Sequence, residues 1–82
     1  MELTIRVGLK ELLLTRKAAE ISTCMGEYES RILIRHENKT VNAKSLMGLI
    51  SLGVCEGKPL TIVAEGADEA RAVHRLAELL GA

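Results

Sequence analysis

The chain has 82 residues, a formal net charge of zero and 48% hydrophobic residues, with Tyr28 as the only aromatic residue. At this length only about two thirds of the unfolded surface can be buried on folding, so we expect one domain over residues 1–82. Balanced charge and the lack of stacking aromatics argue against nucleic-acid binding. No apolar run reaches the ~20 residues that span a bilayer and the N-terminus continues directly into Glu2, so we expect a cytoplasmic protein with no membrane partner.

The two cysteines, Cys24 and Cys55, are far apart in the sequence. Their spacing matches neither a CxxC redox pair nor a zinc-binding pattern. We therefore expect reduced, partly buried thiols, and we expect neither a metal site nor a cofactor.

The first third of the chain predicts a strand followed by a helix. Residues 1–7 alternate between polar and apolar side chains, which is the period of a strand with one solvated face. From Thr15 onward the apolar residues recur at helical spacing, with Thr15 as the predicted N-cap and Gly26 as the stop. The apolar positions of this helix are Ala18, Ile21 and Met25.

The middle of the chain predicts a hairpin. Residues 30–36 alternate through Ile32 and Ile34, and Glu37-Asn38 marks a tight turn before residues 39–43.

A short apolar helix is predicted next. Ser45 precedes it as a capping residue and Gly53 lies near its end. Gly48 sits inside this helix and weakens it by up to ~1 kcal/mol relative to alanine.

The last third predicts a strand and a helix. Pro59 opens a strand over residues 60–64, and Asp68 and Glu69 place negative charge in the first turn of the final helix. The buried positions of that helix are Val73, Leu76 and Leu80. The predicted order is βαββαβα, an α+β open-faced β-sandwich in which three helices cover one face of a four-stranded antiparallel sheet.

Both this order and the local residues resemble the HPr family of the bacterial sugar phosphotransferase system. The segment 39–53, KTVNAKSLMGLISLG, is similar to the family's stretch around its regulatory serine, especially as found in Gram-positive bacteria, and Ser45 falls on that serine. Gly57, the strand over 60–64 and the segment 65–69 continue the match. The resemblance implies the HPr-like fold over the whole chain.

The segment 12–18, LLLTRKA, departs from the family's phosphoacceptor run, which is of the type Gly-Leu-His-x-Arg-Pro-Ala. Leu14 stands at the histidine position, Leu12 at the glycine and Lys17 at the proline, while Arg16 retains the arginine. Leucine has no lone pair with which to attack phosphorus. The resemblance therefore implies an HPr variant that lacks the phosphoacceptor histidine and does not transfer phosphate at this position.

Ser45 has two interpretations that do not exclude each other. As an N-cap it would stabilise the short helix by ~1 kcal/mol without any regulation. By the resemblance it is a site of regulatory phosphorylation, where a phosphate would benefit from the same backbone N–H groups. The neighbouring Lys44 either assists an anionic serine or is an ordinary solvated charge.

Leu46, Met47 and Ile50 also have two interpretations. In HPr-like proteins the corresponding patch contacts the enzymes and regulators of the system, and methionine suits an adaptable apolar contact. The alternative is that Leu46 and Leu49 belong to the core and that only Met47 and Ile50 are exposed.

Two further features are open or unremarkable. The run from Leu12 to Leu14 either packs into an earlier start of the first helix or forms a new protein contact. His36 and His74 are expected to be ordinary solvated histidines, since no second ligand or orienting carboxylate accompanies either of them.

Our first hypothesis is a non-enzymatic interaction module in phosphotransferase-system regulation. Its contact residues would be Thr15 and Arg16 together with the patch near Ser45. The expected partners are an HPr-type serine kinase and either a transcriptional repressor or phosphotransferase-system enzymes. The alternatives are a docking or regulatory subunit of a metabolic enzyme unrelated to sugar transport, and a phosphocarrier that uses another residue.

Overall fold

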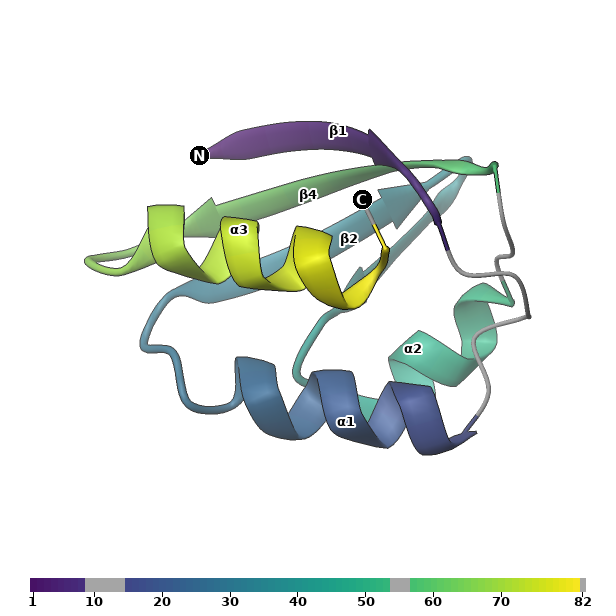
Figure 1. Ribbon diagram of the computed structural model, residues 1–82, viewed down its shortest axis with the longest axis horizontal. Helices are drawn as coiled ribbons and strands as arrows, with labels where there is room; N and C mark the ends of the chain where they lie inside the picture. Colours follow the sequence, from purple (N-terminus) through teal and green to yellow (C-terminus); the bar gives the residue numbers. More distant parts are fainter. Residues whose placement is uncertain (9–14, 54–56, 82) are drawn as a thin grey trace.

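The computed structural model describes residues 1–8, 15–53 and 57–81. Strands and helices follow one another in the predicted order βαββαβα (Figure 1). The elements are β1 (Glu2–Arg6), α1 (Thr15–Met25), β2 (Arg31–His36), β3 (Lys39–Asn42), α2 (Leu46–Leu52), β4 (Pro59–Glu65) and α3 (Glu69–Leu79).

The four strands form one antiparallel sheet in the order β1-β4-β2-β3. The last strand of the chain, β4, therefore lies between β1 and β2. Its residue Ile62 pairs with Leu3 of β1 on one side and with Ile34 of β2 on the other. This register brings the apolar residues of three strands onto the same face, as the alternation in the sequence requires.

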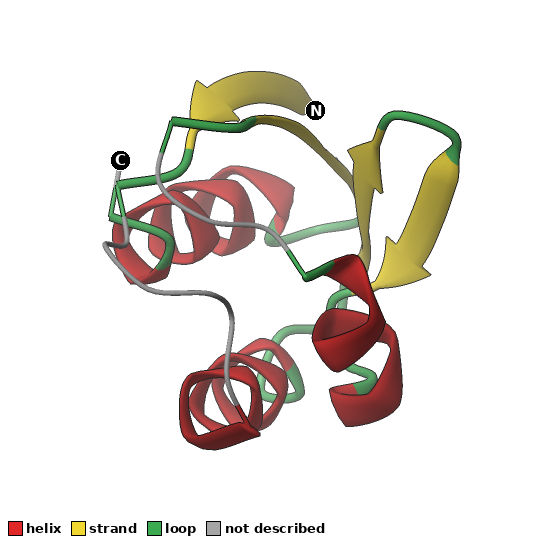
Figure 2. Cartoon of the chain, turned by 90° about the vertical axis from the view of Figure 1, so that its right-hand side faces the viewer, coloured by secondary structure: helices red, strands yellow, loops and turns green. Residues whose placement is uncertain are grey.

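The helices cover that apolar face, and Figure 2 shows all three on the same side of the sheet. The buried sheet residues on this face are Ile32, Ile34, Leu60, Ile62 and Ala64. On the opposite face the side chains are largely polar, and the hydroxyl groups of Thr4 and Thr61 hydrogen-bond across β1 and β4 at 3.1 Å. The predicted open-faced α+β sandwich is confirmed.

The helices α1 and α3 place their apolar residues in the core as predicted, and Ala18, Ile21 and Met25 of α1 are fully buried. The α3 segment buries Val73, Leu76 and Leu80, although Leu80 is the C-cap that follows the last helical residue. The capping prediction for Thr15 is wrong, because Thr15 is itself the first helical residue of α1.

Two glycines meet different requirements of the backbone, a left-handed conformation at Gly53 and a close approach at Gly66. At Gly53, the C-cap of α2, φ is 58°, a left-handed conformation that glycine adopts without steric cost. A Cβ at Gly66, where φ is 150°, would lie 2.6 Å from the hydroxyl oxygen of Ser30. The connection between β4 and α3 can therefore pass against the start of β2 only with glycine at position 66.

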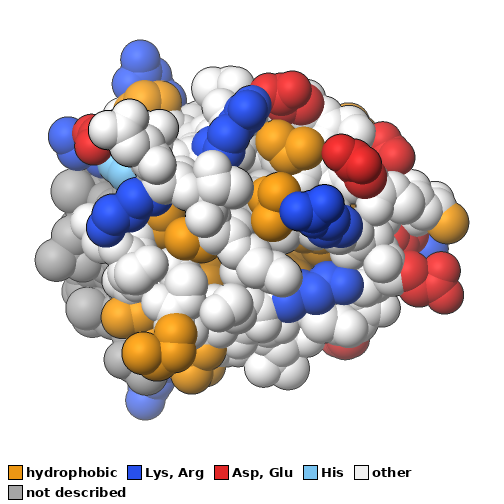
Figure 3. Space-filling model, turned by 180° about the vertical axis from the view of Figure 1, so that it is seen from behind, with side chains coloured by type: hydrophobic (Ala, Val, Ile, Leu, Met, Phe, Trp, Pro, Cys, Tyr) orange, Lys and Arg blue, Asp and Glu red, His pale blue; other side chains and the backbone are white. Residues whose placement is uncertain are grey.

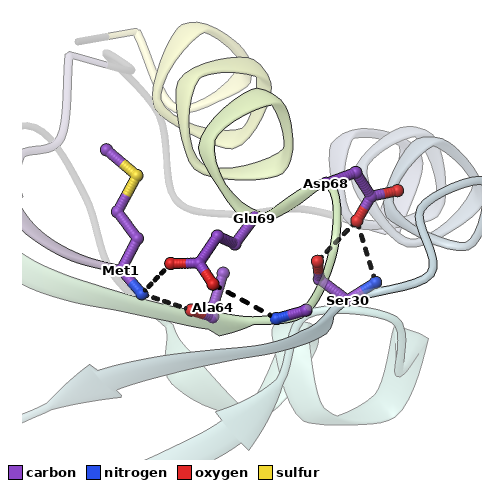
Figure 4. Close-up of polar contacts among 6 residues, drawn as sticks. Met1, Ser30, Ala64, Asp68 and Glu69 are labelled. Carbon is purple, nitrogen blue, oxygen red and sulfur yellow. Dashed lines mark hydrogen bonds and ion pairs between the residues drawn. The ribbon is translucent and has the colours of Figure 1, made fainter.

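A polar network fixes the N-terminus of α3 to β1 and to the start of β2 (Figure 4). The ammonium group of Met1 donates to the backbone oxygen of Ala64 at 2.6 Å and forms an ion pair with Glu69. The Asp68 carboxylate accepts hydrogen bonds from the backbone N–H groups of Glu29 and Ser30 and from the Ser30 hydroxyl. Both carboxylates sit where the dipole of α3 favours negative charge.

Within residues 1–8, 15–53 and 57–81, no helix combines the length and the apolar character that crossing a bilayer requires.

Candidate functional site

Ser45 caps α2, as predicted. Its backbone is extended, with φ −99° and ψ 116°, and its hydroxyl oxygen accepts a hydrogen bond from the backbone N–H of Gly48 at 3.1 Å. The Ser45 carbonyl accepts the first helical bond, from Leu49 at 3.0 Å. A hydroxyl that accepts one hydrogen bond keeps its own proton and a second lone pair, so the capping bond does not use up the hydroxyl of this half-buried residue.

Asn42 positions Ser45, a role that the sequence analysis missed. Its side-chain oxygen accepts from the backbone N–H of Lys44 at 2.8 Å, and its carbonyl accepts from the N–H of Ser45 at 2.9 Å. Asparagine favours this kind of turn with the residue two positions on. The signal was present in the sequence, because Asn42 ends the predicted hairpin shortly before a capping serine.

Gly48 lets α2 pack closely against the hairpin. A Cβ at this position would lie 3.2 Å from the Cβ of Val41 and 3.4 Å from the Oγ of Ser45. The helix thus carries a residue of poor helix propensity at the place where its first turn meets β3.

The surface of α2 follows neither interpretation completely. Leu49 is fully buried, whereas Leu46 is 37% exposed and Met47 is 75% exposed. Ile50 is half-buried and packs against the core. The alternative in which Leu46 belongs to the core is therefore wrong, because the buried residues of the helix are Leu49 and Leu52 and Leu46 lies at its exposed start. Figure 3 shows hydrophobic side chains gathered at the lower left, over α2.

Lys44 is not a freely solvated charge. Its ammonium group donates to the backbone oxygen of Tyr28 at 2.7 Å and the residue is half-buried. The bond joins the residue before Ser45 to the connection between α1 and β2. The interpretation of Lys44 as an ordinary solvated charge is wrong, because its long side chain reaches a carbonyl 16 positions earlier in the chain.

The first turn of α1 contains the other predicted contact residues. Thr15 begins the helix, Arg16 is exposed, and Lys17 forms an ion pair of 3.6 Å with Glu20. The helices α1 and α2 contact each other. The run from Leu12 to Leu14, with the position that the resemblance assigns to the phosphoacceptor, lies outside the described residues.

The two histidines differ. His74 is exposed, as expected. His36 is not an ordinary solvated histidine, because its side chain is only 12% exposed and its Nδ1 lies 3.1 Å from the backbone oxygen of Pro59. Its place at the end of β2 puts it on the same face of the strand as Ile34, next to the first residue of β4.

The prediction of reduced, partly buried thiols can be compared with the structure at one of the two cysteines. Cys24 is a free thiol, half-buried as expected, and Cys55 lies outside the described residues. In the described ranges, no three side chains of histidine, cysteine, aspartate or glutamate are grouped so that they could hold a metal ion.

Comparison with known proteins gives one consistent family. A family profile described as "PTS HPr component phosphorylation site" matches residues 1–82. HPr-like protein Crh of Bacillus subtilis (strain 168) is 40% identical over 73 residues, which are 89% of this chain and 86% of that protein.

Two solved structures share the fold. The crystal structure of a phosphocarrier protein HPr from Bacillus anthracis str. Ames superposes with a TM-score of 0.92 at 36% identity and covers 98% of this chain and 95% of that one. A Crh crystal structure from Bacillus subtilis, described as a swapped dimer, gives a TM-score of 0.80 at 38% identity over 94% of this chain and 88% of that one. The chain described here therefore belongs to the HPr family of the phosphotransferase system.

Proposed function

We propose that this chain is a regulatory member of the HPr family, which acts by binding protein partners and not as an enzyme. Its contact surface, called the α2 surface below, consists of Lys44, Ser45, Leu46, Met47 and Ile50. The neighbouring residues Thr15 and Arg16 of α1 extend it. Phosphorylation of Ser45 controls which partner binds there.

The observation that carries the proposal is the exposed apolar pair beside the capping serine. Leu46 and Met47 expose 37% and 75% of their surface directly after Ser45. Exposed apolar side chains that are contiguous are typical of protein contact sites, and the flexible thioether of methionine adapts to different partners. A phosphate on Ser45 would place up to two negative charges beside this pair.

The serine can accept a phosphate without losing the fold it supports. The residue is half-buried, and its hydroxyl accepts one backbone hydrogen bond. Phosphate oxygens are strong acceptors for such N–H groups. We therefore expect α2 to remain folded in both states, so that regulation acts on the surface.

Histidine phosphotransfer is not part of the proposed role. Leu14 occupies the position that the family resemblance assigns to the acceptor histidine, and a leucine side chain cannot form a phosphoramidate. The histidines that are present, His36 and His74, are respectively a largely buried residue at the hairpin and an exposed residue on α3. Neither belongs to the α2 surface.

The relatives suggest which process the protein serves. Crh of Bacillus subtilis is described as a catabolite repression HPr. We extend that role to this chain, with an HPr-type serine kinase and a transcriptional repressor as its partners, and with phosphotransferase-system enzymes as the alternative.

The test is phosphorylation followed by intact mass spectrometry. Incubation with an HPr-type serine kinase and ATP should add one phosphate to the wild-type protein and none to Ser45→Asn. Asparagine is a matched control because it caps helices about as well as serine but offers no hydroxyl. Absence of phosphate on the wild-type protein would overturn regulation through Ser45.

A parallel incubation tests the carrier function. Treatment with phosphoenolpyruvate and the first enzyme of the system should leave the mass unchanged, while a histidine-containing HPr in the same reaction gains an acid-labile phosphate. An acid-labile phosphate on this chain would show that another residue carries it, and the regulatory role would then not be its only one.

A further inference from the structure

The three methionines of the chain lie in very different environments. Met25 is fully buried in the core, Met1 is 42% exposed beside β1, and Met47 is 75% exposed on the α2 surface. Methionine oxidation follows exposure, and its product, the sulfoxide, is polar. The most accessible thioether in the described residues is thus also part of the exposed apolar pair.

We infer that Met47 is a site of reversible oxidation by peroxides, and that its sulfoxide weakens the binding of partners to the α2 surface. In this reaction a lone pair of the thioether sulfur attacks one oxygen of hydrogen peroxide and the O–O bond breaks. The sulfur gains that oxygen and loses two electrons, and the peroxide is reduced to water. A methionine sulfoxide reductase reverses the step, with a thiol pair oxidised to a disulfide and the oxygen leaving as water.

The fold allows this modification without unfolding. The buried side chains of α2 are Leu49 and Leu52, which are 0% and 6% exposed. Met47 lies on the solvent side of the same helix, so an added oxygen meets water and not packed neighbours. Oxidation therefore changes the polarity of the surface and leaves its support in place.

Two chemically independent inputs would then meet in the first turn of α2. A phosphate on Ser45 adds charge, and a sulfoxide on Met47 removes apolar contact area next to the exposed Leu46. The second input rests on the proposed contact surface, but the oxidation itself does not, and the two can be measured separately.

The first measurement is selective oxidation by hydrogen peroxide. Trypsin cleaves after Arg6, Lys17, Arg31 and Lys44, so the three methionines fall in separate peptides whose oxidation is quantified by mass spectrometry. Met47 should oxidise on the order of tenfold faster than Met25, which peroxide reaches only through local opening. Equal rates for Met47 and Met25 would overturn the inference.

The second measurement is the rate of Ser45 phosphorylation after peroxide treatment, divided by the rate without peroxide, for each protein. Phosphorylation of Ser45 by the serine kinase should slow by about fivefold or more in oxidised wild-type protein, the loss expected for one central contact. Met47→Leu keeps an apolar side chain but has no sulfur, so its own ratio should stay near one whatever its basal rate. Equal slowing of both proteins would assign the effect to Met1 or the cysteines and overturn the inference.

A third readout does not involve a partner. Oxidised wild-type protein should elute earlier from a hydrophobic-interaction column with an unchanged Tm, and a sulfoxide reductase should restore its retention. If the unoxidised protein is not phosphorylated at all, the proposed function fails, yet the oxidation rates and the retention shift still decide the inference. An unchanged retention time would overturn it.

Discussion

Asp68 and Ser30 are joined twice, because the carboxylate of Asp68 accepts hydrogen bonds from both the backbone N–H and the hydroxyl of Ser30. The residues are 38 positions apart and connect the N-terminus of α3 with the start of β2. Together with the bond from the Glu29 N–H at 2.9 Å, these contacts lower the pKa of Asp68 from 3.8 to about 2, with the Ser30 hydroxyl as the largest cause.

Asp68→Asn should remove a pH-dependent part of the stability. The pKa is lower in the folded state, so the charged form stabilises the fold above the unfolded pKa of 3.8, and this contribution disappears as the pH falls through about 2. The Tm of the variant should therefore lie below that of the wild-type protein from pH 5 to 7, and the gap should close toward pH 2.

Thermal unfolding across this pH range checks the prediction. The Glu69 carboxylate, whose pKa is also lowered by its bond with the Met1 ammonium, is present in both proteins. Glu27→Gln, which removes an exposed carboxylate outside the network, is the control. A gap in Tm that persists at pH 2 would show that Asp68 acts through packing and not through its charge.

Gly66→Ala should destabilise the protein more than Gly53→Ala. Both glycines have positive φ, but a Cβ at Gly66 would lie 2.7 Å from the Cα of Ser30, whereas a Cβ at Gly53 meets nothing within 4 Å. We expect a loss of about 2 kcal/mol or more at Gly66 and about 1 kcal/mol at Gly53 in the free energy of unfolding by urea. Equal losses would mean that the connection moves away from Ser30 at little cost.

Ser45→Ala and Ser45→Asn separate the structural and the regulatory roles of the serine. The alanine variant loses the hydrogen bond from Gly48, so its free energy of unfolding should be about 1 kcal/mol lower than that of the wild-type protein. The asparagine variant keeps an acceptor and should stay within about 0.5 kcal/mol of the wild-type protein. Urea unfolding measures both. An alanine variant as stable as the wild type would mean that the cap adds nothing.

Ile50→Ala and Met47→Ala distinguish a side chain of α2 that stabilises the fold from one that is exposed. Ile50 packs against the core, so its truncation should cost about 1–2 kcal/mol. Met47 is 75% exposed, so its truncation should change the free energy of unfolding by less than about 0.5 kcal/mol. If Met47→Ala destabilises the protein as much as Ile50→Ala, the helix packs differently from the structure described.

Much of the fold could be predicted because its signals are local. The alternation around Leu3 and Ile34 predicts strands, and Ser45 and Gly53 mark both ends of α2. The resemblance of residues 39–53 to the HPr family added the topology.

Apart from the Thr15 cap, which concerns only where α1 begins, the wrong expectations depend on how the elements of the fold pack. The bond from His36 to the Pro59 carbonyl, the bond from Lys44 to the Tyr28 carbonyl and the exposure of Leu46 follow from how elements pack. Periodicity gives the face on which a residue lies, but it does not show whether a neighbouring element covers that face. The same holds for Asp68, whose partner Ser30 lies 38 residues away.

The central claim is that Ser45 and the α2 surface form one regulated contact site. The most direct measurement is the Kd for a purified transcriptional repressor of catabolite genes, determined by calorimetry with the unphosphorylated protein, the Ser45-phosphorylated protein and phosphorylated Met47→Asp. We expect phosphorylation to tighten binding by about tenfold or more, and the Met47→Asp substitution to abolish the gain. Equal Kd values for the phosphorylated and unphosphorylated proteins, or full binding by the Met47→Asp variant, would contradict the claim.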